Sequence, residues 1–399
     1  MANPILALIP SGYKATEVYS VLPSDGSGDF TFDRANGLAT RVNKDGLIEE
    51  VANDTPRLDY SNSTCPTLLL EDERTNLQAY SENFGGAAWT PAFSTITANS
   101  NISPNGELSA YNFETTSSAG FLNGFSTIVA NTVYSYSLYV KANTTNICKV
   151  LIFDSNTGGQ KNPYGWIQFD MSTEAITSSL GTASFDKLDN GWYRLKVTGT
   201  SPNPLGGGAT GVEISLTEIG SIFIWGAQME AGSLSSTYIK NVNSASGVTR
   251  FKDKCINGGD ATLFDITEGS FFVDVLPYKS GLFYNISLSN GGSTNRISWQ
   301  FQSNGTQVKL FSSGSVSNLQ AITFNQRNKM LVTFKLNEYK IYINGALVHT
   351  ETGTVPTGFD RVNFAVYAGT NNFFQGEVND TRVYDKVLTP AEAIILTTI

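Results

Sequence analysis

The residues with the clearest capacity to recognise a ligand lie in one short stretch, 164–170. Aromatic, amide and carboxylate side chains alternate there with apolar ones, at the two-residue period of a strand. If Ile167, Phe169 and Met171 face a core, the alternate set faces outward. Flat aromatic rings can stack on a pyranose, and amides and carboxylates can bind its hydroxyls. The candidate glycan-binding residues are therefore Tyr164, Trp166, Gln168 and Asp170. A subunit contact or core packing are the alternatives for Trp166.

Nucleophilic catalysis by a Ser–His–acid or Cys–His group is not expected. Such a site needs an imidazole to accept a proton, and the chain has a single histidine, His349. Its strand face also carries Leu347 and Glu351, and no nucleophile stands near it in the sequence. We therefore expect no catalytic residue, and a packing or surface role for His349.

Carboxylates alone could still support glycoside hydrolysis, which needs a pair about 5–10 Å apart, or could hold calcium. The chain has no Asp-x-Asp-x-Asp loop, and no pair stands out by its spacing. Four carboxylates lie in or beside predicted strands: Asp154, Asp170, Glu213 and Glu230. We interpret them as residues of solvated strand faces and expect no metal site and no cofactor, with a structural Ca²⁺ as the alternative left open.

The cysteines give no sign of a disulfide framework or a zinc site. They are three in number, far apart and without CxxC spacing: Cys65, Cys148 and Cys255. We expect buried thiols. Among the tryptophans, Trp299 alternates with Ile297 and Phe301 and should be buried, while Trp192 and Trp225 lie in motifs that look structural.

Composition indicates an all-β protein. The 399 residues are 40% hydrophobic and 12% aromatic but only 15% charged, which excludes a disordered or coiled-coil chain. The net charge of −9 argues against a nucleic-acid partner, because an acidic surface repels phosphates. No apolar run approaches the roughly 18 residues of a membrane-spanning helix, so we expect no membrane insertion.

Two regions have the regular alternation of β-sandwiches. In the first, residues 79–245, the clearest face is Tyr134, Tyr136, Leu138 and Val140, and further strands are expected at 149–154, 165–171, 212–217 and 221–226. Residues 246–256 are the expected linker. The second region, 257–399, contains a hairpin around Asn344-Gly345, a pair that suits a type I′ turn.

A short helix should follow the last strand. Thr389-Pro390-Ala391-Glu392 has the pattern of a capping box, with Thr389 as N-cap and Glu392 three residues later. We expect this helix to dock through Ala393, Ile394, Ile395 and Leu396.

Residues 1–78 are turn-rich and show no self-sufficient sheet. We expect an irregular arm that lies against the next domain or neighbouring chains and serves in attachment and oligomerisation. Its apolar residues, with one just beyond it, would then be covered by neighbours: Leu68, Leu69, Leu70 and Leu77, with Tyr80.

Several motifs resemble those of known families. The leader, residues 1–78, resembles that of phage fibre and spike proteins in Phe32-Asp33-Arg34, Pro56-Arg57-Leu58-Asp59-Tyr60 and Arg74-Thr75-Asn76-Leu77. In those proteins the leader precedes a carbohydrate-binding-module-like jelly roll. The first region resembles that jelly roll in Asn190-Gly191-Trp192-Tyr193-Arg194 and Ile224-Trp225-Gly226-Ala227-Gln228. The last region resembles a concanavalin A-like (laminin-G-like) domain in Tyr342-Ile343-Asn344-Gly345, Phe374-Gln375-Gly376-Glu377 and Leu388-Thr389-Pro390-Ala391-Glu392.

The resemblance implies a virion surface protein, a head or tail fibre or spike that displays lectin-like domains for host attachment. Such fibres are commonly homotrimers attached to other virion proteins, and their partner on the host is a cell-surface glycan. Fold alone does not fix function. A polysaccharide depolymerase tailspike and a purely structural capsid decoration protein are the two alternatives.

Overall fold

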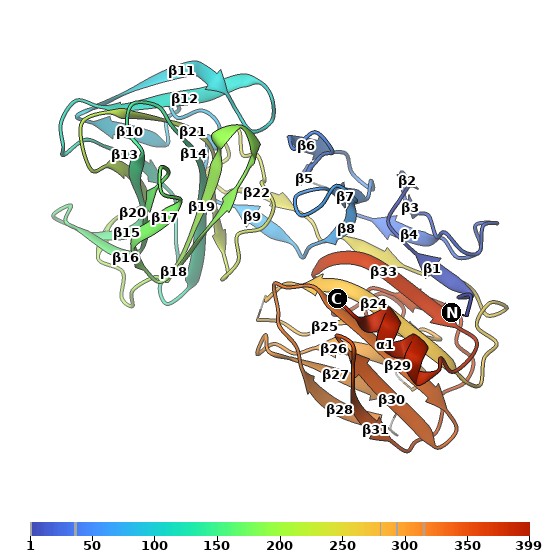
Figure 1. The fold of residues 1–399 in the computed structure, drawn as a ribbon. Coiled ribbons are helices and arrows are strands. Elements are labelled where there is room, and N and C mark those ends of the chain that lie inside the picture. The colour runs from blue at the N-terminus through green and yellow to red at the C-terminus, as the bar shows by residue number, and fades with distance from the viewer. Residues whose placement is uncertain (1, 36–37, 280, 293, 314–315) are drawn as a thin grey trace. The chain divides into compact units, whose positions relative to one another are not determined.

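The computed structural model describes residues 2–35, 38–279, 281–292, 294–313 and 316–399. Within them the chain is built almost entirely of antiparallel strands, with one short helix, α1 (Pro390–Thr397), and a 3₁₀ turn, η1 (Asp189–Gly191) (Figure 1). The predicted all-β fold is confirmed. The chain divides into two compact units. Unit 1 comprises Met1–Asn36, Val51–Glu73 and Phe251–Ile399, and unit 2 comprises Gly37–Glu50 and Arg74–Arg250.

Unit 2 is a sandwich of two six-stranded sheets. The first, here called the β16 sheet, has the order β10 (Trp89–Ala92), β13 (Phe121–Phe125), β20 (Gly207–Leu216), β15 (Ile147–Asn156), β16 (Lys161–Asp170) and β17 (Ala175–Leu180). The second, the β21 sheet, has the order β11 (Ser94–Ile102), β12 (Leu108–Thr115), β21 (Ser221–Ala231), β14 (Val133–Ala142), β19 (Tyr193–Thr200) and β18 (Thr182–Lys187). The strands expected between 149 and 226 are therefore present.

One hydrophobic core fills the space between these two sheets. The alternating face predicted for β14, from Tyr134 to Val140, belongs to it, and so do Ile167 and Phe169 of β16. Each strand contributes every second side chain, because successive side chains of a strand point to opposite faces. The pattern of inward residues therefore fixes which residues of β16 face outward.

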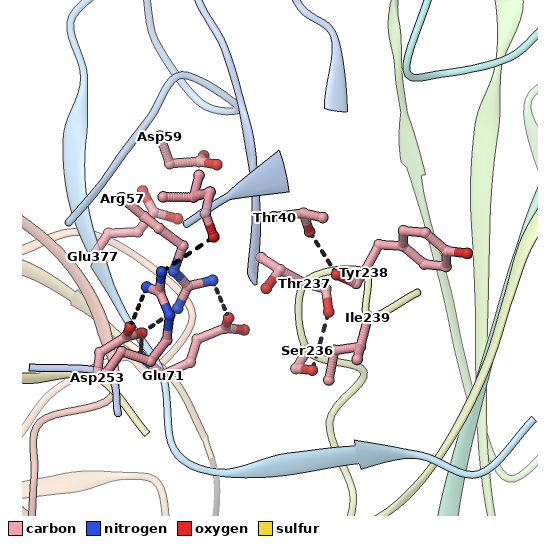
Figure 2. Close-up of polar contacts among 12 residues, drawn as sticks. Thr40, Arg57, Asp59, Glu71, Ser236, Thr237, Tyr238, Ile239, Asp253 and Glu377 are labelled. Atoms are coloured by element: carbon pink, nitrogen blue, oxygen red, sulfur yellow. Dashed lines mark hydrogen bonds and ion pairs between the residues drawn. The ribbon is translucent and has the colours of Figure 1, made fainter. Parts of the chain in front are cut away.

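A second, smaller core lies on the outer face of the β21 sheet. It contains Trp192, Trp225 and Tyr238, with Trp225 and Tyr238 ring centroids 4.7 Å apart. Thr40 donates a hydrogen bond from Oγ1 to the Tyr238 carbonyl oxygen at 2.6 Å (Figure 2). The structural interpretation of Trp192 and Trp225 is thus confirmed. Two short pairs complete unit 2: β5 (Ala39–Val42) with β6 (Ile48–Val51), of which Val51 belongs to unit 1, and β9 (Arg74–Asn76) with β22 (Val248–Arg250).

Unit 1 contains an eight-stranded sheet, the β24 sheet, packed on a five-stranded sheet, the β26 sheet. The β24 sheet has the order β31 (Ala346–Glu351), β30 (Glu338–Ile343), β29 (Asn328–Lys335), β24 (Gly269–Pro277), β33 (Gly376–Tyr384), β8 (Thr67–Leu70) and β7 (Arg57–Asp59), with β1 (Leu6–Leu8) also paired to β33. The β26 sheet has the order β28 (Val316–Ala321), β27 (Gln307–Ser312), β26 (Arg296–Phe301), β25 (Tyr284–Ser289) and β32 (Arg361–Asn363). A small third sheet has the order β2 (Tyr13–Lys14), β3 (Glu17–Val18), β4 (Phe30–Asp33) and β23 (Lys254–Ile256).

Local sequence signals in unit 1 agree with the structure. Trp299, Ile297 and Phe301 all lie in the core between the two large sheets. Asn344 and Gly345 both have positive φ, 49° and 84°, as a type I′ turn requires. These two features were predicted from residue type and spacing alone.

The structure divides the N-terminal region differently from the expected arm of residues 1–78. Strands β1, β7 and β8 extend the β24 sheet, and β4 pairs with β23. Leu68, Leu69 and Leu70 are buried inside unit 1, so the same chain covers the apolar surface that was expected to need neighbours. The segment expected as a linker, 246–256, contains β22 and β23. These pairings join residues as far apart as Leu6 and Val383, 377 positions along the chain, and such long-range partners leave no local pattern.

Helix α1 has the expected capping box, since Thr389 accepts from the Glu392 N–H and Glu392 accepts from the Thr389 N–H. The expectation that Ile394 and Ile395 dock is wrong: they are 42% and 65% exposed, whereas Ala393 and Leu396 are buried. Four consecutive helical residues cannot share one face, and only the i and i+3 pair does. No helix in the described ranges is both long and apolar enough to cross a membrane.

Candidate functional site

The outer face of the β16 sheet carries three of the four predicted site residues. Ile167 and Phe169 are buried in the core, so Trp166, Gln168 and Asp170 point the other way and are each partly exposed. The Trp166 Nε1–H donates to Ser178 Oγ at 3.3 Å, and Gln168 Nε2 donates to Thr177 Oγ1 at 3.1 Å. Both partners lie on the neighbouring strand β17, which holds the two side chains against the sheet.

Tyr164 does not share this face. The pairing of β16 with β15 shifts between Gly165 and Pro163, so Tyr164 is the extra residue of a β-bulge. Its ring packs against the core of unit 2, and burial raises the pKa of its hydroxyl. The prediction of Tyr164 as a ligand-contacting residue assumed an unbroken alternation, which the bulge interrupts.

The Asp170 carboxylate stabilises a local turn at the end of β16 through hydrogen bonds. Its Oδ1 accepts from the Ser172 N–H at 2.9 Å and from Ser172 Oγ at 2.6 Å. These hydrogen bonds lower the pKa of the carboxyl and keep it ionised. Of the predicted set, Trp166 and Gln168 are therefore the pair with aromatic and amide groups on one open face.

A cluster centred on Lys161 lies on the same face and was not predicted. Lys161 Nζ forms an ion pair with Glu213, lies 2.9 Å from Asn123 Oδ1 and is 3.9 Å from the centroid of the Phe121 ring. Glu213 pairs with Leu151 across the sheet, and Leu151 pairs with Trp166. These residues come from separate strands, so no spacing in the sequence marks them.

The four carboxylates considered for hydrolysis lie in different environments. Asp154 is buried and accepts from the Gly206 N–H at 2.8 Å, whereas Glu213 pairs with Lys161. Glu230 is fully buried on β21, in the other sheet, where Ser236 Oγ and Gln228 Nε2 donate to it at 2.5 and 2.7 Å. Asp154 and Glu230 are thus closed off from solvent, whereas Asp170 and Glu213 share the outer face of the β16 sheet, where Asp170 bonds Ser172 and Glu213 pairs with Lys161. In the part of the chain that the structure describes, no group of three or more His, Cys, Asp or Glu residues is arranged to hold a metal ion.

His349 lies at the edge of the β24 sheet and is partly exposed. Its Nε2 is 2.9 Å from Asn318 Nδ2 and 3.4 Å from Glu351 Oε2. Neither neighbour carries the hydroxyl or thiol that an imidazole base would activate, which agrees with the predicted packing or surface role. Among the cysteines, Cys148 and Cys255 are buried as expected, and burial raises the pKa of Cys148 to about 12. Cys65 is exposed, which contradicts the prediction that all three are buried.

A buried ionic network in unit 1 was also not predicted. Arg57 donates to Glu71 Oε2 at 2.7 Å and pairs with Asp253, which also accepts from Arg34 Nη1 at 3.0 Å (Figure 2). The two arginines and Asp253 are fully buried. Ionic groups without solvent need such pairing, since an uncompensated buried charge is strongly destabilising. Because its members come from residues 34–71 and from residue 253, the network joins distant parts of unit 1.

Beside this network lies Glu377, whose carboxyl group has a raised pKa. It is buried on β33 and accepts from Asn62 Nδ2 at 2.7 Å and from Tyr278 OH and Thr67 Oγ1 at 3.2 Å each. Burial, with the nearby charge of Asp59, raises its pKa to about 7 (Figure 2). The hydrogen bonds oppose this shift without cancelling it.

A cavity of about 410 Å³ lies within unit 2 beside Trp225 and Tyr238. Its polar groups largely bind one another: Lys240 Nζ is 2.9 Å from Glu82 Oε2, and the Tyr238 hydroxyl donates to Glu82 Oε1 at 3.1 Å. The Lys240 ammonium and the Tyr238 hydroxyl are therefore already paired within the cavity wall.

One family model matches a segment of the chain. Residues 265–393 match the model of the concanavalin A-like lectin/glucanases superfamily. This segment includes β24 to β33 and so most of the two large sheets of unit 1. It confirms the expected concanavalin A-like domain for the C-terminal region. No curated protein matches the chain in sequence.

Among solved structures, three similarities are representative. The CBM40 module of the Ruminococcus gnavus IT-sialidase, bound to α2,3-sialyllactose, is 20% identical over 35% of this chain and 86% of its own, with a TM-score of 0.30. Domain 4 of AbnA, a GH43 extracellular arabinanase from Geobacillus stearothermophilus in complex with arabinotriose, is 17% identical over 37% and 73%, also at 0.30. The Trypanosoma rangeli sialidase in complex with sialic acid is 9% identical over 76% and 70%, at 0.29. Similarities at these TM-scores do not bear on function.

Proposed function

We propose that this chain is a non-enzymatic glycan-binding protein of a virion surface, a subunit of a head or tail fibre or spike. The concanavalin A-like segment of residues 265–393 supports a lectin-like role for unit 1. The virion setting rests on the resemblance of the leader motifs to those of phage fibre and spike proteins. Fold by itself is compatible with many functions, so the site has to supply the argument for binding.

The observation that carries the proposal is the outward pair Trp166 and Gln168 on the β16 sheet. A partly exposed indole gives a flat apolar surface for the C–H face of a pyranose, and the amide beside it offers a donor and an acceptor for sugar hydroxyls. Both are held by hydrogen bonds to β17, so little side-chain entropy is lost when a ligand binds. The arrangement suits binding without chemical change.

A glycan array with the purified full chain tests this proposal. Binding to a defined set of glycans that is reduced in a Trp166→Ala variant would support it. A blank array would overturn it and favour the purely structural decoration protein. A reducing-sugar assay against host capsule or lipopolysaccharide distinguishes binding from cleavage. Release of reducing ends would identify the chain as a depolymerase instead.

We further propose that the subunit assembles as a homotrimer and attaches to other virion proteins, as the resemblance implies. Several weak sites on one rigid fibre would act together, because linkage raises their effective concentration at a host surface. The apolar residues of β8 do not support this part, since they are already buried within unit 1. Light scattering tests it directly: a soluble monomer at micromolar concentration would overturn the trimer.

A further inference from the structure

Arg296, the first residue of β26, is a nearly buried cation without an anionic partner. It is 8% exposed, and no described carboxylate forms an ion pair with it. Its guanidinium carbon lies 4.5 Å from the centroid of the Phe311 ring and 5.3 Å from that of Tyr367. The guanidinium is therefore held by two aromatic rings, which attract a cation without neutralising it.

The nitrogens of Arg296 differ in accessibility. Nε and Nη1 are sealed from solvent and have no hydrogen-bond partner, whereas Nη2 is neither sealed nor bonded. Ser298 Oγ, two residues along the same strand face, is likewise buried without a partner. Burying an unpaired charge costs free energy, and an anion bound at the accessible Nη2 would recover part of that cost. The open Nη2 shows from which side the anion can arrive.

Tyr367 supplies a second feature at the same place. Its ring is 37% exposed, and its backbone has a φ of 56°, in the left-handed region that a bulky residue rarely adopts. Asn363 Nδ2 donates to the Tyr367 carbonyl oxygen at 2.9 Å and helps to hold this conformation. Backbone strain of this kind persists where surrounding structure enforces it, often at ligand sites. Here it places an exposed aromatic ring beside an unpaired guanidinium.

We propose that Arg296, Phe311 and Tyr367 form a site for an acidic sugar, whose carboxylate binds Arg296 Nη2 and whose ring packs on Tyr367. The site rests on the proposed glycan-binding function and specifies its ligand class. A carboxylate suits the site because a charge-assisted hydrogen bond supplies the missing counter-charge. A neutral sugar would leave Arg296 as unpaired as it is now. The Tyr367 ring favours a pyranose over a small inorganic anion, because the anion has no apolar face that could stack on the ring.

Glucuronic acid and glucose provide a direct test, since they differ in a carboxylate at C6. Titration of the ¹⁵N-labelled full chain should show glucuronate binding at least about tenfold more tightly than glucose, the effect of one charge-assisted hydrogen bond. Arg296→Gln should abolish the preference. Tyr367→Asn should weaken glucuronate binding. The fold should be retained, because asparagine tolerates the positive φ of this position. Lys386→Gln, an exposed lysine elsewhere in unit 1, is the matched charge control and should change nothing.

Three results would overturn the site. They are equal affinity for glucuronate and glucose, equal binding of inorganic phosphate with the same dependence on Arg296, and glucuronate binding unchanged in both site variants. If the glycan array shows neutral glycans bound through Trp166, the proposed function stands while this site fails. If the array is blank and glucuronate does not bind, both fail together. Thermal unfolding of each variant separates loss of binding from loss of fold.

Discussion

Lys149 and Trp166 lie on neighbouring strands of the β16 sheet, with the Lys149 ammonium 4.9 Å from the centroid of the Trp166 ring. The ammonium is close enough for a cation–π interaction, which orients the indole on the open face of the sheet. The Trp166 Nε1–H is held at the same time by Ser178 of β17. An indole fixed from both sides in this way is a preorganised platform.

The first prediction concerns this platform. Trp166→Ala should weaken adhesion to host cells without unfolding the chain, because the indole is partly exposed and its removal leaves no core cavity. An aromatic side chain at the centre of a binding site commonly contributes about 2 kcal/mol, which is about thirtyfold in affinity. Cell-binding assays measure the adhesion, and circular dichroism checks that the variant remains folded. Unchanged adhesion with an intact fold would remove Trp166 from the site.

A second prediction contrasts this tryptophan with a buried one. Trp299 is fully buried in the core of unit 1, so Trp299→Ala should destabilise the chain by about 3–5 kcal/mol. Denaturant unfolding of the two variants, followed by circular dichroism, measures the difference. If both alanine variants lost similar stability, Trp166 would be a packing residue and the outward interpretation of β16 would be wrong.

A third prediction follows from the acidity of Glu377, whose pKa is raised from 4.5 to about 7. Between these values the folded chain binds more protons than the unfolded chain, so the free energy of unfolding should fall as pH rises through this interval. The fall should approach about 1.4 kcal/mol per pH unit for one group. Asp59 and Tyr278 face the same carboxyl and are the groups that couple to it.

Glu377→Gln should remove this slope and make the chain more stable than the unmodified one above pH 7, because the amide keeps an acceptor for Asn62 and Tyr278 but carries no charge. Urea unfolding at several pH values measures the effect. Glu268→Gln, at an exposed carboxylate of the same unit, is the control. The same pH slope in the Glu377→Gln variant would contradict the assignment.

Local signals in the sequence predict local structure well in this chain. The Asn344-Gly345 turn requires positive φ at both positions, and Thr389 with Glu392 satisfies the first N–H groups of a helix. Each rule concerns residues within a few positions of one another. For the same reason the alternation in β16 correctly places Trp166 and Gln168 outward.

Features that depend on distant residues could not be predicted. The bulge at Tyr164 depends on the register with β15, and the Lys161 cluster combines three strands. Strands β1 and β8 pair with β33, near the other end of the sequence, so the neighbouring residues in the sequence do not show what covers their apolar side chains. Arg296 and Tyr367 are 71 positions apart, and neither position is marked until the fold brings them together.

The last prediction concerns the buried carboxylate that Arg34 and Arg57 share. Asp253→Asn should destabilise unit 1 by about 3–5 kcal/mol, because the amide leaves two buried guanidinium groups with too little negative charge. Of the five tryptophans only Trp299 belongs to unit 1, so its indole Nε1–H signal in a ¹H–¹⁵N spectrum reports on that unit alone. On addition of urea this signal should shift to its unfolded position at a lower concentration in the variant, while the signals of the unit 2 tryptophans move as before. Asp72→Asn, at a less buried carboxylate nearby in sequence, should stay within about 0.5 kcal/mol of the unmodified chain. If Asp253→Asn were equally mild, the N-terminal strands would be held in unit 1 by strand pairing and apolar packing alone.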